Sequence, residues 1–256
     1  MGFHCHAQVD TEFWFAPPEV TSGHGDGPLF LRVSSQDKPA TIRVLQPAAA
    51  VKELVTFSIP ANTTRSIRLS ELTSNLETRP PAKVLTTGLH IVSSAPITAY
   101  YEVGASLNGE IFVLKGKNAL GNKFIIVGQN YYDNSPDFIP TPYASFDVVA
   151  TEDNTIIKVK ANHPVFGHEG EDVITVRLNA GQTYSFMKPT SLAIDNFIGT
   201  VVESSKPIAI TIKDDSVINS TCRDLLGDQL IPTTVAGKEY IVLRGSLAQR
   251  EFFYPK

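Results

Sequence analysis

The chain has 256 residues, of which 42% are hydrophobic and 19% charged, and its formal net charge is −4. This composition is typical of a folded globular protein and excludes wholesale disorder. The acidic balance lacks the positive field by which proteins bind nucleic acid, and no apolar run reaches the roughly 18 residues of a membrane-spanning helix. The 17 Gly, 17 Pro and 14 Phe, beside only 2 Met, favour many short strands and turns over helices.

The first residues, MGFHCHAQ, look like the end of a signal peptide, with Cys5 and Ala7 at the small-residue positions of a cleavage site. We therefore predict that residues 1–8 are a residual leader and that the protein is exported, to be secreted or displayed on the cell surface. Cys222 would then be the only cysteine of the mature chain. Because no His lies near it in the sequence to lower its pKa, we expect a buried, inert thiol.

The first half of the chain predicts a series of short strands. Glu12–Pro17 (EFWFAP) is the first, and Trp14, inside this apolar strand, is expected to pack in the core of this half. Residues 31–44 and 55–69 each resemble two strands around a polar turn, where Asp, Asn or Pro reverses the chain. His90–Val103 (HIVSSAPITAYYEV) follows, with a proline that fixes φ at a corner.

The second half repeats this order. The first strand recurs near residues 123 and 239, a period of about 110 residues, which is that of a small domain and not of a solenoid repeat. Residues 147–159 and 174–187 again predict paired strands, and Thr200–Lys213 (TVVESSKPIAITIK) repeats the Ser-Ser-x-Pro corner. An internal duplication explains these correspondences together.

We predict an all-β protein of two tandem β-sandwich-like repeats, with one larger barrel or a propeller-like array as the alternative. No amphipathic helix separates the strands, which argues against a βαβ arrangement. The first repeat would span residues 9–120 and the second 121–236, with 237–256 as closing strands or the start of a third repeat. Two local expectations concern the second repeat: Cys222–Val235 begins like a helical turn, and Asp214 with Asp215 follows a strand end as turn formers.

Four phrases of the chain, EFWFAP, FDVVATEDNTIIKV, TVVESSKPIAI and DLLGDQLIPTTVAGKEYIV, resemble the N-terminal domain of the IgG Fc-binding protein family. The resemblance runs from about Glu12 to Phe253 and suggests a bacterial secreted or surface member. It implies a non-catalytic binding or adhesive module that forms part of a longer multidomain chain. Fc binding itself is not carried over, because no residue motif for it can be matched.

The long loop Gln129–Tyr143 (QNYYDNSPDFIPTPY) is the predicted recognition site, since long loops on a rigid sheet commonly carry function. Aromatic side chains stack on apolar faces of sugars and proteins, and Tyr adds a polar group. The predicted ligand is a glycoprotein, mucin or glycan. The candidate ligand-binding residues are Tyr131, Tyr132, Asp133, Phe138 and Tyr143.

No catalytic residue, cofactor or metal is predicted, because the chain has no nucleophile elbow, phosphate-binding loop, HExxH or CxxC. The most metal-like residues have spacings that match no known framework, so we expect a solvated loop. They are His163, His168, Glu169, Glu171 and Asp172. The aspartates of the loops could in principle bind calcium, but we expect them to form turns.

Two other functions stay open. A carbohydrate-active or other hydrolytic enzyme would use a carboxylate pair from the acidic loops, such as Asp133 and Asp137. A structural spacer in a larger surface protein would show no exposed aromatic patch. The binding module remains the preferred interpretation, and we predict that the protein is not an enzyme.

Overall fold

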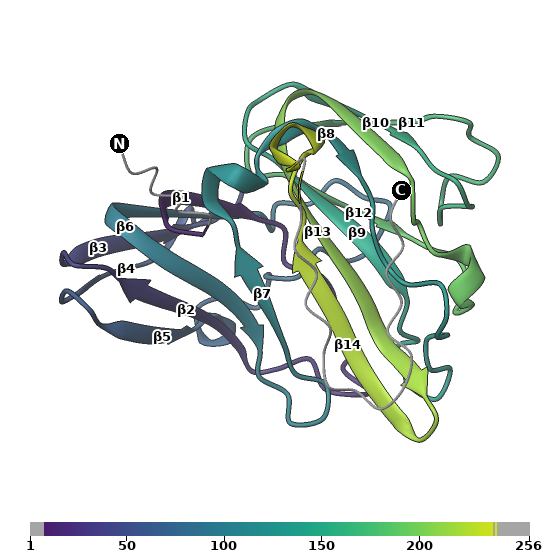
Figure 1. The fold of residues 1–256 in the computed structure, drawn as a ribbon, viewed down its shortest axis with the longest axis horizontal. Coiled ribbons are helices and arrows are strands. Elements are labelled where there is room, and N and C mark those ends of the chain that lie inside the picture. The colour runs from purple at the N-terminus through teal and green to yellow at the C-terminus, as the bar shows by residue number, and fades with distance from the viewer. Residues whose placement is uncertain (1–7, 238, 240–256) are drawn as a thin grey trace.

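The computed structural model describes residues 8–237 and 239, which form fourteen strands and four short 3-10 helices (Figure 1). The helices are η1 (Leu69–Glu71), η2 (Gly116–Ala119), η3 (Ala193–Asp195) and η4 (Thr233–Val235). In this described part of the chain, no helix has the length and apolar character needed to cross a bilayer. The predicted leader and closing strands lie outside the described residues, apart from residues 8, 237 and 239.

The first half forms a seven-stranded antiparallel sheet around one long strand, β6. Its order is β4-β3-β6-β2-β5, and β1 and β7 also pair with β6. Alternate residues of β2 and β3 are buried, as expected for strands with one face on a core. The strands are β1 (Asp10–Phe15), β2 (Leu29–Ser35), β3 (Ala40–Leu45), β4 (Glu53–Ile59), β5 (Thr64–Arg68), β6 (Leu89–Val103) and β7 (Glu110–Leu114).

The second half forms a second seven-stranded sheet around β13, in the order β11-β10-β13-β9-β12, with β8 and β14 also on β13. Each strand has the partners of its counterpart seven strands earlier, which confirms the prediction of an all-β fold with two tandem repeats. We call these halves unit 1 and unit 2. The strands of unit 2 are β8 (Gly121–Ile125), β9 (Ala144–Ala150), β10 (Thr155–Lys160), β11 (Ile174–Leu178), β12 (Thr183–Met187), β13 (Val201–Asn219) and β14 (Cys222–Gln229).

The duplicated Ser-Ser-x-Pro sequence lies inside the two long strands, where each changes partners. The first part of β6 pairs with β1 and β3, and its second part pairs with β2 and β7. β13 does the same with β8 and β10, then with β9 and β14. The register with β1 and β8 shifts across this point, so the proline marks the corner at which one strand passes between two parts of its sheet.

The two serines explain why this corner is retained in both units. The Oγ atoms of Ser93 and Ser204 each donate to the carbonyl oxygen two residues ahead, at 2.7 Å in both cases. The next serine in each unit accepts a hydrogen bond from a backbone N–H of the adjacent strand, at 2.9 Å to Ser94 and 2.9 Å to Ser205. These bonds satisfy backbone groups that the bend removes from the sheet ladder.

Each unit has its own apolar core, and a third, smaller cluster joins them. Trp14 and Ala16 of unit 1 pack in this cluster with Val149 and Ala209 of unit 2. Trp14 is therefore buried as predicted, but at the junction and not in the core of unit 1. Side chains alternate along β1, so the neighbours of Trp14 face the unit 1 core while its indole stacks on His90 with ring centroids 3.9 Å apart.

Two expectations for residues 222–235 are wrong. The segment begins with the strand β14 and not with a helical turn, because residues 222–229 pair with the last part of β13. Cys222 is exposed and not buried, since it is the first residue of β14 and pairs with Asn219 directly beside the turn of the hairpin. The prediction failed because the absence of a His near Cys222 in the sequence says nothing about whether the thiol is buried.

Candidate binding surface

The predicted recognition loop connects β8 to β9 and packs against the corresponding loop of unit 1. The ring of Phe138 stacks on that of His24, with centroids 4.3 Å apart and planes inclined by 10°. Thr21 donates its hydroxyl to the carbonyl oxygen of Pro140, and Gly23 leaves no space for a Cβ, which would lie 2.7 Å from the carbonyl oxygen of Ile139. The loop is thus held from the side of unit 1.

Backbone hydrogen bonds also hold this loop to β13. Ser135 donates its N–H to the carbonyl oxygen of Ser216 at 2.9 Å, and Ile218 donates to the carbonyl oxygen of Asp133 at 2.8 Å. Asn134 forms an isolated antiparallel bridge with Val217. Part of the loop therefore behaves as a short additional strand.

A buried carboxylate fixes the start of the loop. Asp214 accepts hydrogen bonds from Gln129 at 2.6 Å and Asn134 at 2.7 Å. Burial raises the pKa of Asp214, and the amide donors oppose that rise. Gln129 in turn accepts the N–H groups of Tyr131 and Tyr132 at 2.8 and 2.7 Å. The chain of bonds from β13 to the two tyrosines positions them before any ligand binds.

The expectation that Asp214 and Asp215 follow a strand end is wrong, because both lie inside β13 and are buried. Asp215 accepts the N–H of Thr21 at 2.7 Å and an amide hydrogen of Asn108 at 3.3 Å. Buried carboxylates need such donors, so these two aspartates hold unit 1 and the loop onto β13 and form no turn.

The five predicted residues have different surroundings. Tyr131 is 78% exposed and meets the partly buried Tyr132 edge to face, with centroids 4.9 Å apart. Asp133 is exposed, yet its carboxylate accepts a hydrogen bond from the N–H of Ala193 at 2.6 Å. Phe138 and Tyr143 are partly buried. Tyr131 and Tyr132 are therefore the predicted residues best placed to contact a partner, whereas Asp133 and Phe138 mainly hold the loop.

The structure adds apolar residues that the sequence analysis missed. Leu192 and Ile194 are exposed on either side of Ala193, whose N–H binds Asp133. They come from the segment before β13, so only the tertiary structure brings them beside the loop. We define the loop surface as Tyr131, Tyr132, Leu192 and Ile194. Ile139, 87% exposed on the same loop, was also missed.

The carboxylate pair of the hydrolase alternative is engaged in the structure of the loop. Asp137 forms an ion pair with Arg223 at 2.9 Å and accepts a hydrogen bond from Ser135. These partners lower the pKa of Asp137, whereas a general acid needs a raised one. Asp133 and Asp137 thus have the environments of structural residues.

Glu77 is a buried carboxylate that lines a cavity in unit 1. Burial raises the pKa of Glu77 to about 7, and Glu77 lines a cavity of about 390 Å³ together with Asp26. Its two oxygens are occupied, one by the N–H of Val20 at 2.9 Å and the other by Arg79 at 3.5 Å. Glu77 therefore anchors the segment after β1.

The metal-like cluster does not come together as a site. His168 contacts Glu171 at 2.9 Å through Nδ1 and the hydroxyl of Tyr184 at 2.6 Å through Nε2. Within residues 8–237 and 239, no group of three or more His, Cys, Asp or Glu side chains could hold a metal ion. His168 serves to hold its loop against β12.

Comparison with known proteins identifies a family for this chain. Residues 110–254 match the family model described as IgGFc binding protein. The matched segment is more than half of the chain and contains all of unit 2 as the structure describes it, together with β7 of unit 1. A search of curated proteins gives no match.

Proposed function

The chain belongs to the IgGFc binding protein family, and from this premise we propose that it is a secreted or cell-surface, non-catalytic module that binds a glycoprotein through the loop surface. The family match supports a protein or glycoprotein partner. The observation that carries the choice of site is the position of Tyr131, which is 78% exposed on a loop that the buried side chain of Asn134 holds to β13 by hydrogen bonds to Asp214 and Asp215.

Such a loop suits recognition for an energetic reason. A loop that must order on binding loses conformational entropy, whereas a loop already held in place does not. Tyr131 and Tyr132 offer large aromatic faces with few rotatable bonds, and the neighbouring Leu192 and Ile194 add apolar area. The exposed tyrosine counts against the structural spacer, which predicts no exposed aromatic patch.

Binding of the full chain to immobilised IgG Fc, to mucin and to protein-free glycans tests the proposal. Tyr131→Ala and Tyr132→Ala should each weaken binding to one of these by about tenfold or more, as expected for aromatic residues at the centre of an interface. Phe166→Ala is the matched control, because Phe166 is an aromatic residue of unit 2 that is 44% exposed outside the loop surface.

The outcomes separate the possible ligands. Loss of mucin binding after enzymatic deglycosylation would identify the glycan as the ligand, and retained binding would identify the protein. If the tyrosine variants stay folded by circular dichroism and bind all targets as the wild type does, the loop surface is not the site.

A further inference from the structure

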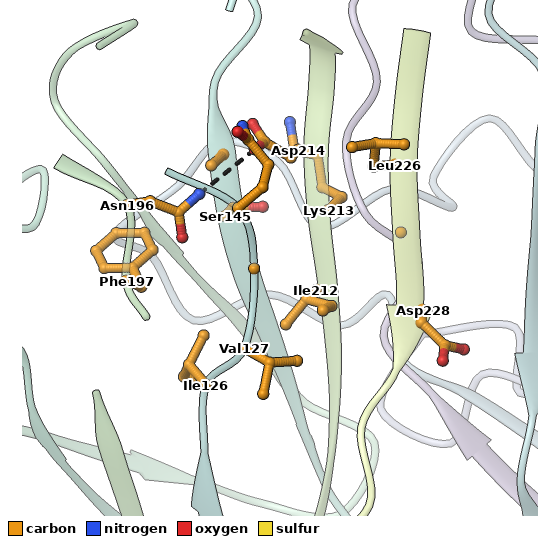
Figure 2. A pocket seen from close by; sticks show the side chains of 14 residues that line it. Ile126, Val127, Ser145, Asn196, Phe197, Ile212, Lys213, Asp214, Leu226 and Asp228 are labelled. Atoms are coloured by element: carbon orange, nitrogen blue, oxygen red, sulfur yellow. Dashed lines mark hydrogen bonds between the residues drawn. The ribbon is translucent and has the colours of Figure 1, made fainter. Parts of the chain in front are cut away.

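Unit 2 has an opening that unit 1 lacks. A cavity of about 220 Å³ lies between the segment after β8, the second part of β13, and β14. Figure 2 shows Ile126, Val127 and Ile212 on its apolar side, with Leu226 across from them. Val127 and Leu226 are respectively 52% and 40% exposed, so the opening presents apolar side chains at the surface.

The corresponding place in unit 1 is filled with aromatic rings. Phe112 pairs with Tyr101 in unit 1 as Asp228 pairs with Ile212 in unit 2, and Phe15 lies at the end of β1 beside them. The rings of Phe15, Tyr101 and Phe112 lie 4.9 to 6.0 Å apart and are essentially inaccessible to solvent.

Unit 2 has smaller or polar side chains at these positions. Ile126 follows β8 as Phe15 ends β1, and Ile212 stands where unit 1 has Tyr101. Asp228 replaces Phe112, and its carboxylate forms an ion pair with Lys115 at 2.5 Å. The missing ring volume leaves the opening.

Unit 1 is also covered by the next unit at this place. Leu225 of β14 is buried in the core of unit 1, and Gly227 faces Phe112 so closely that a Cβ would lie 2.2 Å from Cε1 of the ring. β14 of unit 2 therefore lies against β7 of unit 1, and Figure 1 shows the two strands side by side. Glycine is required because the ring of Phe112 already fills the space.

The residue of unit 1 that corresponds to Gly227 is Ile111. Ile111 pairs with Glu102 of β6 as Gly227 pairs with Lys213 of β13. It is 51% exposed, and Leu107, in the turn before β7, is exposed as well. In unit 1, rings fill the opening and the residue that covers it is a glycine. In unit 2, the side chains of residues 8–237 leave the opening unfilled, and the residue that would cover it from another copy is an isoleucine, so the two volumes are complementary.

We propose that this protein associates head to tail with further copies of itself. Within the chain, β14 packs against β7; between copies, β7 of one copy packs against β14 of the next in the same way. Ile111 of the first copy enters the opening beside Leu226 and Val127 of the second. The two surfaces are different, so the contact is heterologous and each added copy exposes a new opening. Association is therefore open-ended.

Sedimentation velocity of the full chain, from micromolar to submillimolar concentration, tests this association. The weight-average mass of the wild type should rise continuously with concentration. Ile111→Asp and Leu226→Asp should each give a monomer, because a carboxylate would be placed in an apolar contact. Val51→Asp, at an exposed apolar residue of the turn between β3 and β4, is the matched control and should associate as the wild type does.

Mixing the two aspartate variants gives the sharpest result. The Leu226→Asp chain retains its Ile111 and the Ile111→Asp chain retains its opening, so an equimolar mixture should form a one-to-one dimer and nothing larger. Asp228→Phe should also give a monomer, because the ring fills the opening from within as Phe112 does in unit 1. This variant should keep the wild-type circular dichroism spectrum.

Three results would overturn the proposal. The first is a wild type that stays monomeric at submillimolar concentration. The second is association that persists in both aspartate variants, and the third is a mixture of these variants that fails to dimerise although each is folded. None of these results bears on the loop surface, so the proposed function and the self-association can fail separately.

Discussion

Equivalent positions of the two units hold opposite charges in opposite environments. Ser35 pairs with Ile97 in unit 1 as Ala150 pairs with Ile208 in unit 2. This register makes Arg32 of unit 1 equivalent to Asp147 of unit 2, and Glu102 equivalent to Lys213. Arg32 donates to Glu102 at 2.8 Å on a face that is partly open to solvent. Asp147 and Lys213 are buried, because the same face of unit 2 packs toward Trp14 and Ala16 of unit 1.

The consequence of that burial is visible in the pKa of Asp147. Burial raises it to about 7, although Lys213 and two serines act to lower it. One carboxylate oxygen of Asp147 has no hydrogen-bond partner. A repeated sheet position therefore acquires its energetic importance from the unit that packs against it, and four pairs of substitutions test this difference between the units.

The largest effect is expected at the filled opening of unit 1. Phe112→Ala should lower the free energy of unfolding by about 3–5 kcal/mol, since it leaves a cavity in a core that is closed on all sides. The equivalent change in unit 2, Asp228→Ala, should cost less than about 1 kcal/mol because it removes one partly exposed ion pair. Urea denaturation measures both, and equal losses would contradict the proposed difference between the openings.

The buried charge of unit 2 should matter more than its exposed counterpart. Lys213→Ala removes the cation that pairs with Asp215, at 3.9 Å, and should cost about 3 kcal/mol because it leaves this buried carboxylate without its ion pair. Glu102→Ala in unit 1 should cost about 1 kcal/mol or less. The same denaturation experiment should be done in low and in high salt. Only the loss of unfolding free energy caused by Glu102→Ala should become smaller in high salt, because that ion pair is partly exposed. If Lys213→Ala lowers the free energy of unfolding no more than Glu102→Ala does, the junction tolerates the unpaired carboxylate of Asp215.

The titration of Asp147 makes stability depend on pH. The native state keeps its proton up to about pH 7, whereas the unfolded chain loses it at the ordinary aspartate pKa. Stability from this group is therefore fully present below that ordinary value and is lost as pH rises through about 7, by up to about 1.4 kcal/mol per pH unit. Asp147→Asn should flatten the fall in the free energy of unfolding between pH 5 and 8.

An exposed carboxylate of the same unit supplies the control for this titration. Asp172→Asn removes one carboxylate at an exposed position of unit 2, so any change that it shares with Asp147→Asn comes from the lost charge and not from burial. A profile of Asp147→Asn identical to that of the wild type would mean that this carboxylate titrates normally in the folded protein.

The smallest effect should be equal in the two units. Ser93→Ala and Ser204→Ala each remove one hydrogen bond to a carbonyl at the corner of a long strand, at the same 2.7 Å. Each should lower the free energy of unfolding by about 1 kcal/mol. Thermal melts of the two single variants measure this, and a clear inequality would show that the corners have diverged despite their shared geometry.

Much of the fold could be predicted from the sequence because it depends on local patterns. Alternating side chains, turn residues and the repeated Ser-Ser-x-Pro correctly indicate two all-β repeats, and the Pro does lie where the chain jogs. The candidate site was predicted only in part. Tyr131 was recognisable from its loop, but Leu192 and Ile194 approach it through long-range hydrogen bonds that no local pattern encodes, from Ala193 to Asp133 and from Asn134 to Ser191.

The sequence alone determined the strands, their duplication and the family, since strand periodicity and turn chemistry act between residues close along the chain. Which of the equivalent residues are buried depends instead on how the two units pack against each other. Trp14 faces the other unit, Cys222 faces solvent, and Asp214 lies inside a strand that extends beyond its counterpart in unit 1. Burial depends on what packs against each face, and in a duplicated protein the two copies necessarily meet different neighbours.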